Sequence, residues 1–216
     1  MSGGEPEPVD GPVDPDLAEE LPGLRVRSVV VAGSAGRTPR PLRERLRDVT
    51  SRFLGAHAIA LRTRPVPQAY RTLFRHIGLD PDVDRTPVEQ AAVDRLIRGE
   101  FCTGERVVDA LALAIVETGV PVSCFDEDAL SGAVGLRPAR AGETLAAGGY
   151  AHDLPAGRLV LADDAGPVAV VFGRLSDRHA PRRDSTRLRL VAVQAPGVPD
   201  VHVDEALWLA AGALSD

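Results

Sequence analysis

Two clusters of acidic residues are the parts of this sequence best suited to chemistry. They are Asp126-Glu127-Asp128 and Asp163-Asp164. Neighbouring carboxylates can hold a hard cation or carry out acid–base steps. Each cluster follows an apolar run, however, and the residues after Asp163 include the Gly typical of a tight turn. We therefore interpret both clusters as residues that end strands, cap turns and face water.

The remaining candidates for chemistry lack partners. Ser123 lies beside Cys124, but no base can be assigned to either residue, so a hydrolase built on them is the hypothesis with the least support. The five histidines are scattered without metal-ligand spacing, and we predict neither a metal nor another cofactor. The glycine-rich stretch at residues 29–38, VVVAGSAGRT, lacks the ending of a nucleotide-binding loop and predicts a plain turn.

Charge is unevenly distributed along the 216 residues, whose formal net charge is -6. Residues 1–20 contain seven acids and no base, which predicts a disordered acidic tail over residues 1–22, ahead of a single domain at residues 23–216. Residues 37–106 contain 14 Arg and 9 acids, an excess of +5 that would suit a phosphate-binding face. The sequence shows no signal peptide, membrane span or CxxC pair, so we expect a cytoplasmic protein with reduced thiols.

Apolar periodicity predicts helices mainly in the first half of the chain and strands mainly in the second. The predicted helices cover residues 41–55, 67–77, 87–98, 105–118 and 203–214. Thr86 and Glu89 have capping-box spacing at the start of the third helix, and Gly99 and Gly119 are the stop signals of the third and fourth. The predicted strands cover residues 24–32, 57–63, 121–125, 133–138, 158–162, 167–172 and 187–193. This order favours an α+β fold, with the helices packed on a mostly antiparallel sheet.

Residues 107–145 carry a longer pattern. It consists of Val108-Asp109, a helix, Glu117, Gly119, Pro121, Phe125-Asp126, Arg137 and Gly142-Glu143. This pattern resembles the B3/B4 module of the beta subunit of bacterial phenylalanyl-tRNA synthetase, which edits misacylated tRNA. It is also similar to free-standing proteins built from that module, and the resemblance extends over about residues 62–214.

The resemblance implies a role for several residues. Phe125 would anchor the core, and Asp126 would be a turn residue rather than a catalyst. The implied ligand pocket comprises Leu111, Ala112, Ser123, Val171 and Phe172. At these positions the synthetase module has Thr-Asn, His and Ala-Gly, respectively. The pocket of this chain is therefore expected to be more apolar, and no catalytic residue is assigned.

Two functions follow as hypotheses. In the first, the chain binds tRNA and edits misacylated tRNA in trans, with the substrate or the backbone orienting the water that these side chains do not. The candidate phosphate contacts are then Arg71, Arg75, Arg85 and Arg95. In the second, the chain is a non-catalytic module that binds a small amino-acid-like ligand in an apolar pocket.

Overall fold

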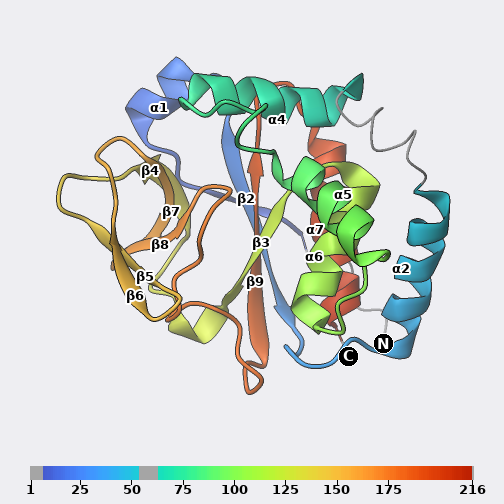
Figure 1. Cartoon of the computed structure of the whole chain (residues 1–216). Coiled ribbons are helices and arrows are strands. Elements are labelled where there is room, and N and C mark those ends of the chain that lie inside the picture. The colour runs from blue at the N-terminus through green and yellow to red at the C-terminus, as the bar shows by residue number, and fades with distance from the viewer. Residues whose placement is uncertain (1–6, 54–62, 216) are drawn as a thin grey trace.

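A four-stranded antiparallel sheet forms the centre of the molecule. The computed structural model describes residues 7–53 and 63–215. The strand order is β1 (Val9–Gly11), β2 (Arg25–Ala32), β9 (Arg187–Gln194) and β3 (Val122–Asp126). The first and last of the long strands in the sequence, β2 and β9, thus lie side by side (Figure 1). The fold is α+β, as the sequence predicts.

Helices pack against this sheet and against one another. Helices α6 (Arg106–Thr118) and α7 (Asp200–Leu214) pack together and contact the sheet, while α2 (Arg40–Arg52) and α5 (Pro87–Arg98) pack on α6. Helix α4 (Pro65–His76) runs along one end of the sheet (Figure 1). Its Tyr70 hydroxyl donates to the carbonyl oxygen of Val193 at 2.8 Å. No helix in the described ranges is long and apolar enough to cross a membrane.

A separate group of strands, the strand lobe, lies on the other side of the sheet (Figure 1). It contains a three-stranded antiparallel sheet of β4 (Gly135–Pro138), β7 (Leu159–Asp163) and β8 (Gly166–Val170). The hairpin of β5 (Thr144–Ala147) and β6 (Tyr150–Asp153) completes the lobe, and the 3-10 turn η2 (Glu127–Ala129) links it to β3. The hairpin was not predicted from the sequence.

The predicted helix signals act as expected in α5 and α6. Glu89 accepts hydrogen bonds from the backbone N–H and the hydroxyl of Thr86, at 3.1 and 2.9 Å, which confirms the predicted capping box. Gly99 and Gly119 end the two helices with φ of 87° and 80°, a conformation that glycine adopts without a Cβ clash. The strand predicted at 57–63 lies, except for residue 63, outside the described residues.

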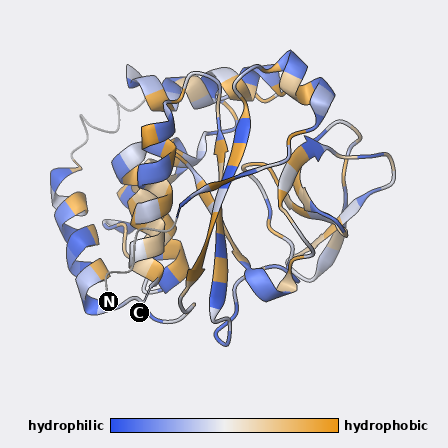
Figure 2. Ribbon diagram, turned by 180° about the vertical axis from the view of Figure 1, so that it is seen from behind, coloured by the Kyte–Doolittle hydropathy of each residue, from blue (hydrophilic) through white to orange (hydrophobic). Residues whose placement is uncertain are grey.

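One apolar core joins the helices, the central sheet and part of the strand lobe. Phe125 on β3 is fully buried in it, as the resemblance implies. Apolar residues concentrate in the central strands and in α6 and α7, whereas α2 is largely hydrophilic (Figure 2). The inner side of α2 is apolar through Leu42, Leu46 and Val49, which are all buried.

The disorder predicted for residues 1–22 is wrong for residues 9–21. Strand β1 pairs with β2, and α1 (Pro15–Glu20) follows it with Asp14 as its N-terminal cap. Leu17 and Leu21 are 6% and 7% exposed, respectively, and both pack into the core. Composition was misleading here because two leucines spaced four residues apart bury enough apolar surface to fix a segment that is otherwise acidic.

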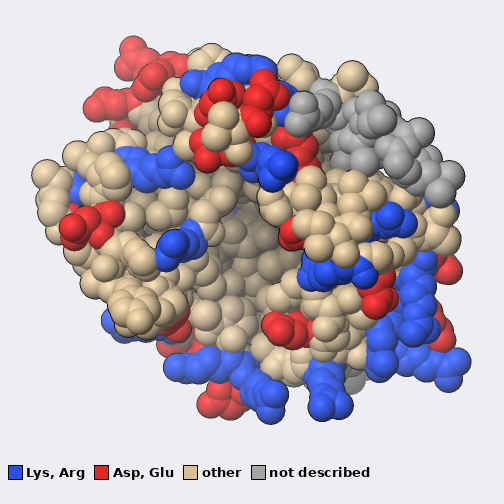
Figure 3. All heavy atoms as spheres, viewed as in Figure 1, with Lys and Arg blue, Asp and Glu red and all other residues tan. Residues whose placement is uncertain are grey.

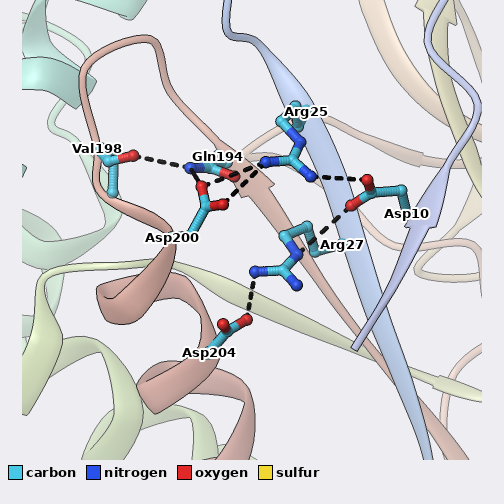
Figure 4. A network of polar contacts seen from close by, with 7 residues as sticks. All are labelled: Asp10, Arg25, Arg27, Gln194, Val198, Asp200 and Asp204. Carbon is cyan, nitrogen blue, oxygen red and sulfur yellow. Dashed lines mark hydrogen bonds and ion pairs between the residues drawn. The ribbon is translucent and has the colours of Figure 1, made fainter. Parts of the chain in front are cut away.

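The acids of this segment and of α7 also find basic partners. Arg25 contacts Asp10 at 2.7 Å and Asp200 at 3.1 Å. Arg27, two residues further along β2, bridges Asp10 and Asp204 (Figure 4). The two arginines therefore connect β1 to the start of α7 across β2, and they neutralise charges that the sequence alone leaves unpaired.

The burial of Leu17 predicts a measurable stability loss. Leu17→Ala should lower the free energy of unfolding by about 2 kcal/mol or more, because it removes a buried side chain and leaves a cavity. Leu96→Ala, at a position that is 53% exposed on α5, is the matched control and should change it by less than about 0.5 kcal/mol. Urea denaturation measures both, and equal small effects would mean that α1 does not pack on the core.

Candidate ligand cavity

A cavity of about 350 Å³ lies between α5, α6, the start of β3 and the segment after β8. The face of the molecule shown in Figure 3 is hollowed between the strand lobe and the helices. The inner wall of the cavity is apolar and is formed by Phe101, Leu111, Ala112, Ile115, Val122 and Phe172. Such a volume is at the lower end of the range for small-molecule sites and suits a ligand of a few heavy atoms beyond an amino acid backbone.

The rim of the cavity is polar and carries both signs of charge. Arg85, Gln90, Asp94 and Arg98 contribute to it. The Gln90 amide donates to Asp94 at 2.7 Å, and an Arg98 nitrogen lies 3.9 Å from the same carboxylate. Arg85 is exposed and has no carboxylate partner within the described ranges. The rim can therefore meet an ammonium group at Asp94 and an anionic group at Arg85.

Phe172 forms one wall of the cavity in an unusual backbone conformation. Its φ is 56°, and among the non-glycine residues that the structure describes no other has a positive φ. Its ring stacks on Phe74 at a centroid distance of 5.3 Å and meets Tyr70 edge-on at 5.8 Å. A left-handed conformation is unfavourable for a bulky side chain, so these aromatic contacts must offset the backbone strain.

The structure brings together three of the five pocket residues expected from the resemblance. Leu111, Ala112 and Phe172 line the cavity, but Ser123 and Val171 do not. Val122 lines it instead, and successive side chains of a strand point to opposite faces, which places Ser123 on the other face of β3. Val171 is 2% exposed and packs into the core. On β3 the expected position therefore differs from the observed one by a single residue, whereas Val171 has no substitute beyond Phe172, which was already expected.

The buried carboxylate of Asp109 fixes the start of α6, from which the cavity residues Leu111 and Ala112 extend. Asp109 is 0% exposed. It accepts hydrogen bonds from the backbone N–H groups of Thr103 and Gly104, at 2.6 and 3.0 Å, and from the Thr103 and Thr38 hydroxyls. A buried carboxylate is tolerated only with such a full set of donors, so this cluster holds the segments before α2 and α6 in place.

Comparison with known families supplies the deciding observation. The sequence model of the B3/4 domain family matches residues 69–196, more than half of the chain. This chain belongs to the B3/4 domain family. It is also 40% identical over 78 residues to the phenylalanine–tRNA ligase beta subunit of Thiobacillus denitrificans. That match covers 36% of this chain and 10% of the length of the ligase subunit.

Several residues of the shared pattern have structural roles in this B3/4 domain. Arg137 donates two hydrogen bonds to Glu143, at 2.7 and 2.8 Å, and thereby lowers the pKa of Glu143 to about 2. Glu117 lies 3.7 Å from Arg52 and links α6 to α2. Pro121 lines the cavity at the entry to β3.

The first acidic cluster of the B3/4 domain ends a strand and caps a turn, as the sequence indicates, but Asp126 and Glu127 do not face water as predicted. Asp126 is 3% exposed and accepts a hydrogen bond from the Ser185 hydroxyl at 2.8 Å. Glu127 forms a two-point pair with Arg189, at 2.6 and 2.7 Å, and Asp128 pairs with Arg187. All three carboxylates are engaged in tying η2 to β9 and to the segment before it.

The second acidic cluster forms the predicted turn between β7 and β8. The Asp163 carboxylate accepts from the backbone N–H groups of Ser131, Ala165 and Gly166 at 2.8, 2.9 and 3.1 Å. It therefore holds the hairpin and the preceding loop together rather than facing a ligand.

Cys124 is unsuited to nucleophilic chemistry. The thiol is 3% exposed on β3, and burial, with a further contribution from Asp126, raises its pKa to about 12. A neutral buried thiol is a poor nucleophile. Geometry thus gives no support to the hydrolase hypothesis built on this residue.

The four arginines expected to contact phosphate have different environments. The expectation is wrong for Arg71, because its guanidinium is buried and binds Glu89 and Asp82 at 2.7 and 2.6 Å. Arg95 is half-buried and donates to the carbonyl oxygen of Thr50 at 3.2 Å. Arg75 is exposed on α4, and Arg85 is exposed at the cavity rim. Of the four, only Arg85 is therefore placed next to the cavity.

Sequence reasoning missed Gln90, Asp94 and Arg98 as rim residues. They stand four residues apart on α5, so they share one face of a helix whose bounds were predicted correctly. That spacing was the available signal. It could not be read because the sequence does not say which face of α5 borders a cavity and which faces open water.

The backbone strain at Phe172 predicts an unusual order of stability. Phe172→Gly and Phe172→Ala should both unfold more easily than the native chain, because both lose the aromatic contacts. Glycine should nevertheless be the more stable variant by about 1 kcal/mol, since a Cβ is unfavourable at φ of 56°. Urea denaturation of the two variants tests this. The usual order, with alanine more stable than glycine, would contradict the strained conformation.

The environment of Arg71 predicts a structural rather than a binding role. Arg71→Gln should lower the free energy of unfolding by about 3 kcal/mol, because Glu89 would remain buried without its cationic partner. Arg75→Gln, four residues further along α4 and exposed, should change it by less than about 0.5 kcal/mol. Thermal and urea unfolding compare the two. Equal effects would mean that Arg71 is not held by Glu89 and is available to bind a ligand.

Proposed function

We propose that this B3/4 domain binds an aminoacyl group with a small apolar side chain, presented at the end of a tRNA. The single observation that carries the proposal is the cavity, which combines an apolar inner wall with the carboxylate of Asp94 and the guanidinium of Arg85 at its rim. An aminoacyl ester has a matching distribution of groups: an apolar side chain, a cationic ammonium group and an anionic phosphate nearby.

The polarity of the cavity supports the orientation of the ligand. The side chain of the aminoacyl group would lie against Leu111 and Ala112, because these residues offer it an apolar surface. The ammonium group would lie at Asp94, where a carboxylate can accept charge-assisted hydrogen bonds. Phe172 occupies the position of the Gly in the synthetase pattern and limits the space, which favours small side chains.

The relatives support a tRNA as the carrier of this group. The ligase subunit to which the chain is similar is named for phenylalanine and tRNA. Because the match covers 10% of that subunit, the activity of the whole ligase does not transfer with it. What is proposed here concerns binding by the domain alone.

Binding without hydrolysis is the form of the proposal that the cavity supports best. The side chains of the inner wall within the described ranges are apolar, so they cannot hold a water or stabilise an oxyanion. Editing in trans would need those functions from the backbone or from the tRNA itself. A deacylation assay with mischarged tRNA, run beside a binding assay, separates the two.

A free amino-acid-like metabolite is the alternative ligand. The same rim could hold its ammonium group at Asp94 and its carboxylate at Arg85. The two ligands differ in their dependence on RNA. Binding of tRNA that strengthens at low salt supports the first, whereas binding of the amino acid with no affinity for tRNA at any salt concentration supports the second.

The role of Asp94 gives the direct test. Leucinamide should bind the native chain, and Asp94→Asn should weaken that binding roughly fivefold to tenfold, because a partly exposed ion pair contributes about 1 kcal/mol. The analogue of leucinamide without its amino group should bind both proteins equally. Asp153→Asn, at an exposed acid of the strand lobe, is the control and should bind like the native chain. Calorimetry that finds no leucinamide binding would overturn the proposal.

A further inference from the structure

Helix α2 carries a concentration of arginine that the fold does not use. It contains five Arg and two acids in 13 residues. Arg40 pairs with Glu44, and Arg52 lies near Glu117. The other three, Arg43, Arg45 and Arg47, are exposed and have no carboxylate partner within the described ranges. In a chain with a net charge of -6, this local excess of positive charge needs a reason.

The arrangement works against the stability of α2 itself. Arg43 and Arg47 stand four residues apart, where like charges repel across one helical turn. Arg40 lies in the first turn, which contains no acid, and the positive end of the helix disfavours cations there. A helix with only a solvated surface would gain from acids at these positions. An anionic partner would turn the same charges into favourable contacts.

A polar recess of about 810 Å³ lies at the start of α2 and continues the positive charge. Its lining includes Arg37, which lies three residues before α2, and Arg183 from the loop before β9, together with one exposed acid, Glu105. Both arginines are exposed and have no carboxylate partner within the described ranges. Ser34, Gly36 and Thr103 also line the recess and leave room for a group of phosphate size.

The recess and the cavity described above both border the first turn of α6. Val107 lines the recess, and its neighbour Val108 lines the cavity. Consecutive residues of a helix rise by about 1.5 Å along its axis and point about 100° apart, so the two hollows border adjoining sides of the first turn of α6. A ligand could therefore place one end in the cavity and extend over the first turn of α6 into the recess.

We propose that a basic track, formed by Arg37, Arg43, Arg47 and Arg183, binds the phosphates of the RNA strand whose aminoacyl end enters the cavity. Arg45 lies on the opposite flank of α2, in the lining of a separate hollow beside α7, and is not part of the track. The inference rests on the proposed function and adds the surface that holds the body of the RNA. Much of the track lies outside residues 69–196, the segment matched by the family model. Figure 3 shows basic side chains gathered over α2 and along the adjoining edge of the hollowed face.

The chemistry of the track favours RNA over a protein or a membrane. Guanidinium groups bind phosphate oxygens in two-point contacts, and all 25 basic residues of the chain are Arg. The leucines of α2 are buried against the core, which leaves no apolar face to enter a membrane surface. A protein partner would require apolar anchors at the centre of the contact. The apolar lining residues beside α2, such as Pro41 and Trp208, lie with Arg45 on the other flank of the helix.

The experiment compares three variants of the full chain by measuring tRNA affinity from about 50 to 200 mM salt. The first combines Arg43→Gln and Arg47→Gln, and the second combines Arg37→Gln and Arg183→Gln. The control combines Arg75→Gln, Arg140→Gln and Arg178→Gln, which removes three exposed arginines from other surfaces. Each lost phosphate contact should reduce the slope of log affinity against log salt by about 0.7 to 0.9.

The expected result is a loss of about one to two units of slope in each of these two variants. The control should retain the native slope, and all three variants should bind leucinamide like the native chain. Equal losses in the control would overturn the track. So would leucinamide binding with no tRNA affinity, which would leave the cavity proposal in its small-molecule form. Tighter binding to vesicles of anionic phospholipid or to an acidic peptide than to tRNA would also overturn it.

Discussion

The buried carboxylate of Asp109 is the constraint on which the candidate site depends. It is fully removed from water, so its charge must be satisfied by donors within the protein. Those donors come from Thr38, just before α2, and from residues 102–104, just after α5. One side chain therefore fixes where α2, α5 and α6 begin or end relative to one another. The cavity and the recess lie on either side of this point, and neither would keep its shape if the cluster came apart.

Around that fixed point, apolar and charged side chains occupy different parts of the cavity. The inner wall of the cavity holds only apolar side chains among the described lining residues, while the charged groups lie at the rim on α5 and at residue 85. The floor of the cavity is thus apolar and its entrance is charged. A floor of this kind favours retention of an apolar group, and an entrance of this kind favours a charged one. Recognition by such a site does not require a chemical step.

The sequence was most informative where one physical signal acts alone. Apolar periodicity and end caps placed α5 and α6 within a residue or two, because capping boxes and glycine stops are local. Strand β1 and α1 were missed because their stability comes from partners far along the chain, such as Arg25 and the core around Leu17. The β5–β6 hairpin was missed although Gly148-Gly149 at its tip, with φ of 64° and 79°, is a recognisable turn signal. At the site, a shift of one residue on β3 exchanged Ser123 for Val122, since neighbouring strand residues face opposite sides.

The most direct test of the account is a crystal structure of the full chain with a short RNA strand that carries a leucyl group at its 3′ end through a stable amide bond. The account predicts density for the leucyl side chain against Leu111 and Ala112, and for the amino group within hydrogen-bonding distance of Asp94. It further predicts phosphates beside Arg37 and Arg183. Density for the leucyl group elsewhere on the protein, with the cavity occupied by solvent at saturating ligand, would contradict it.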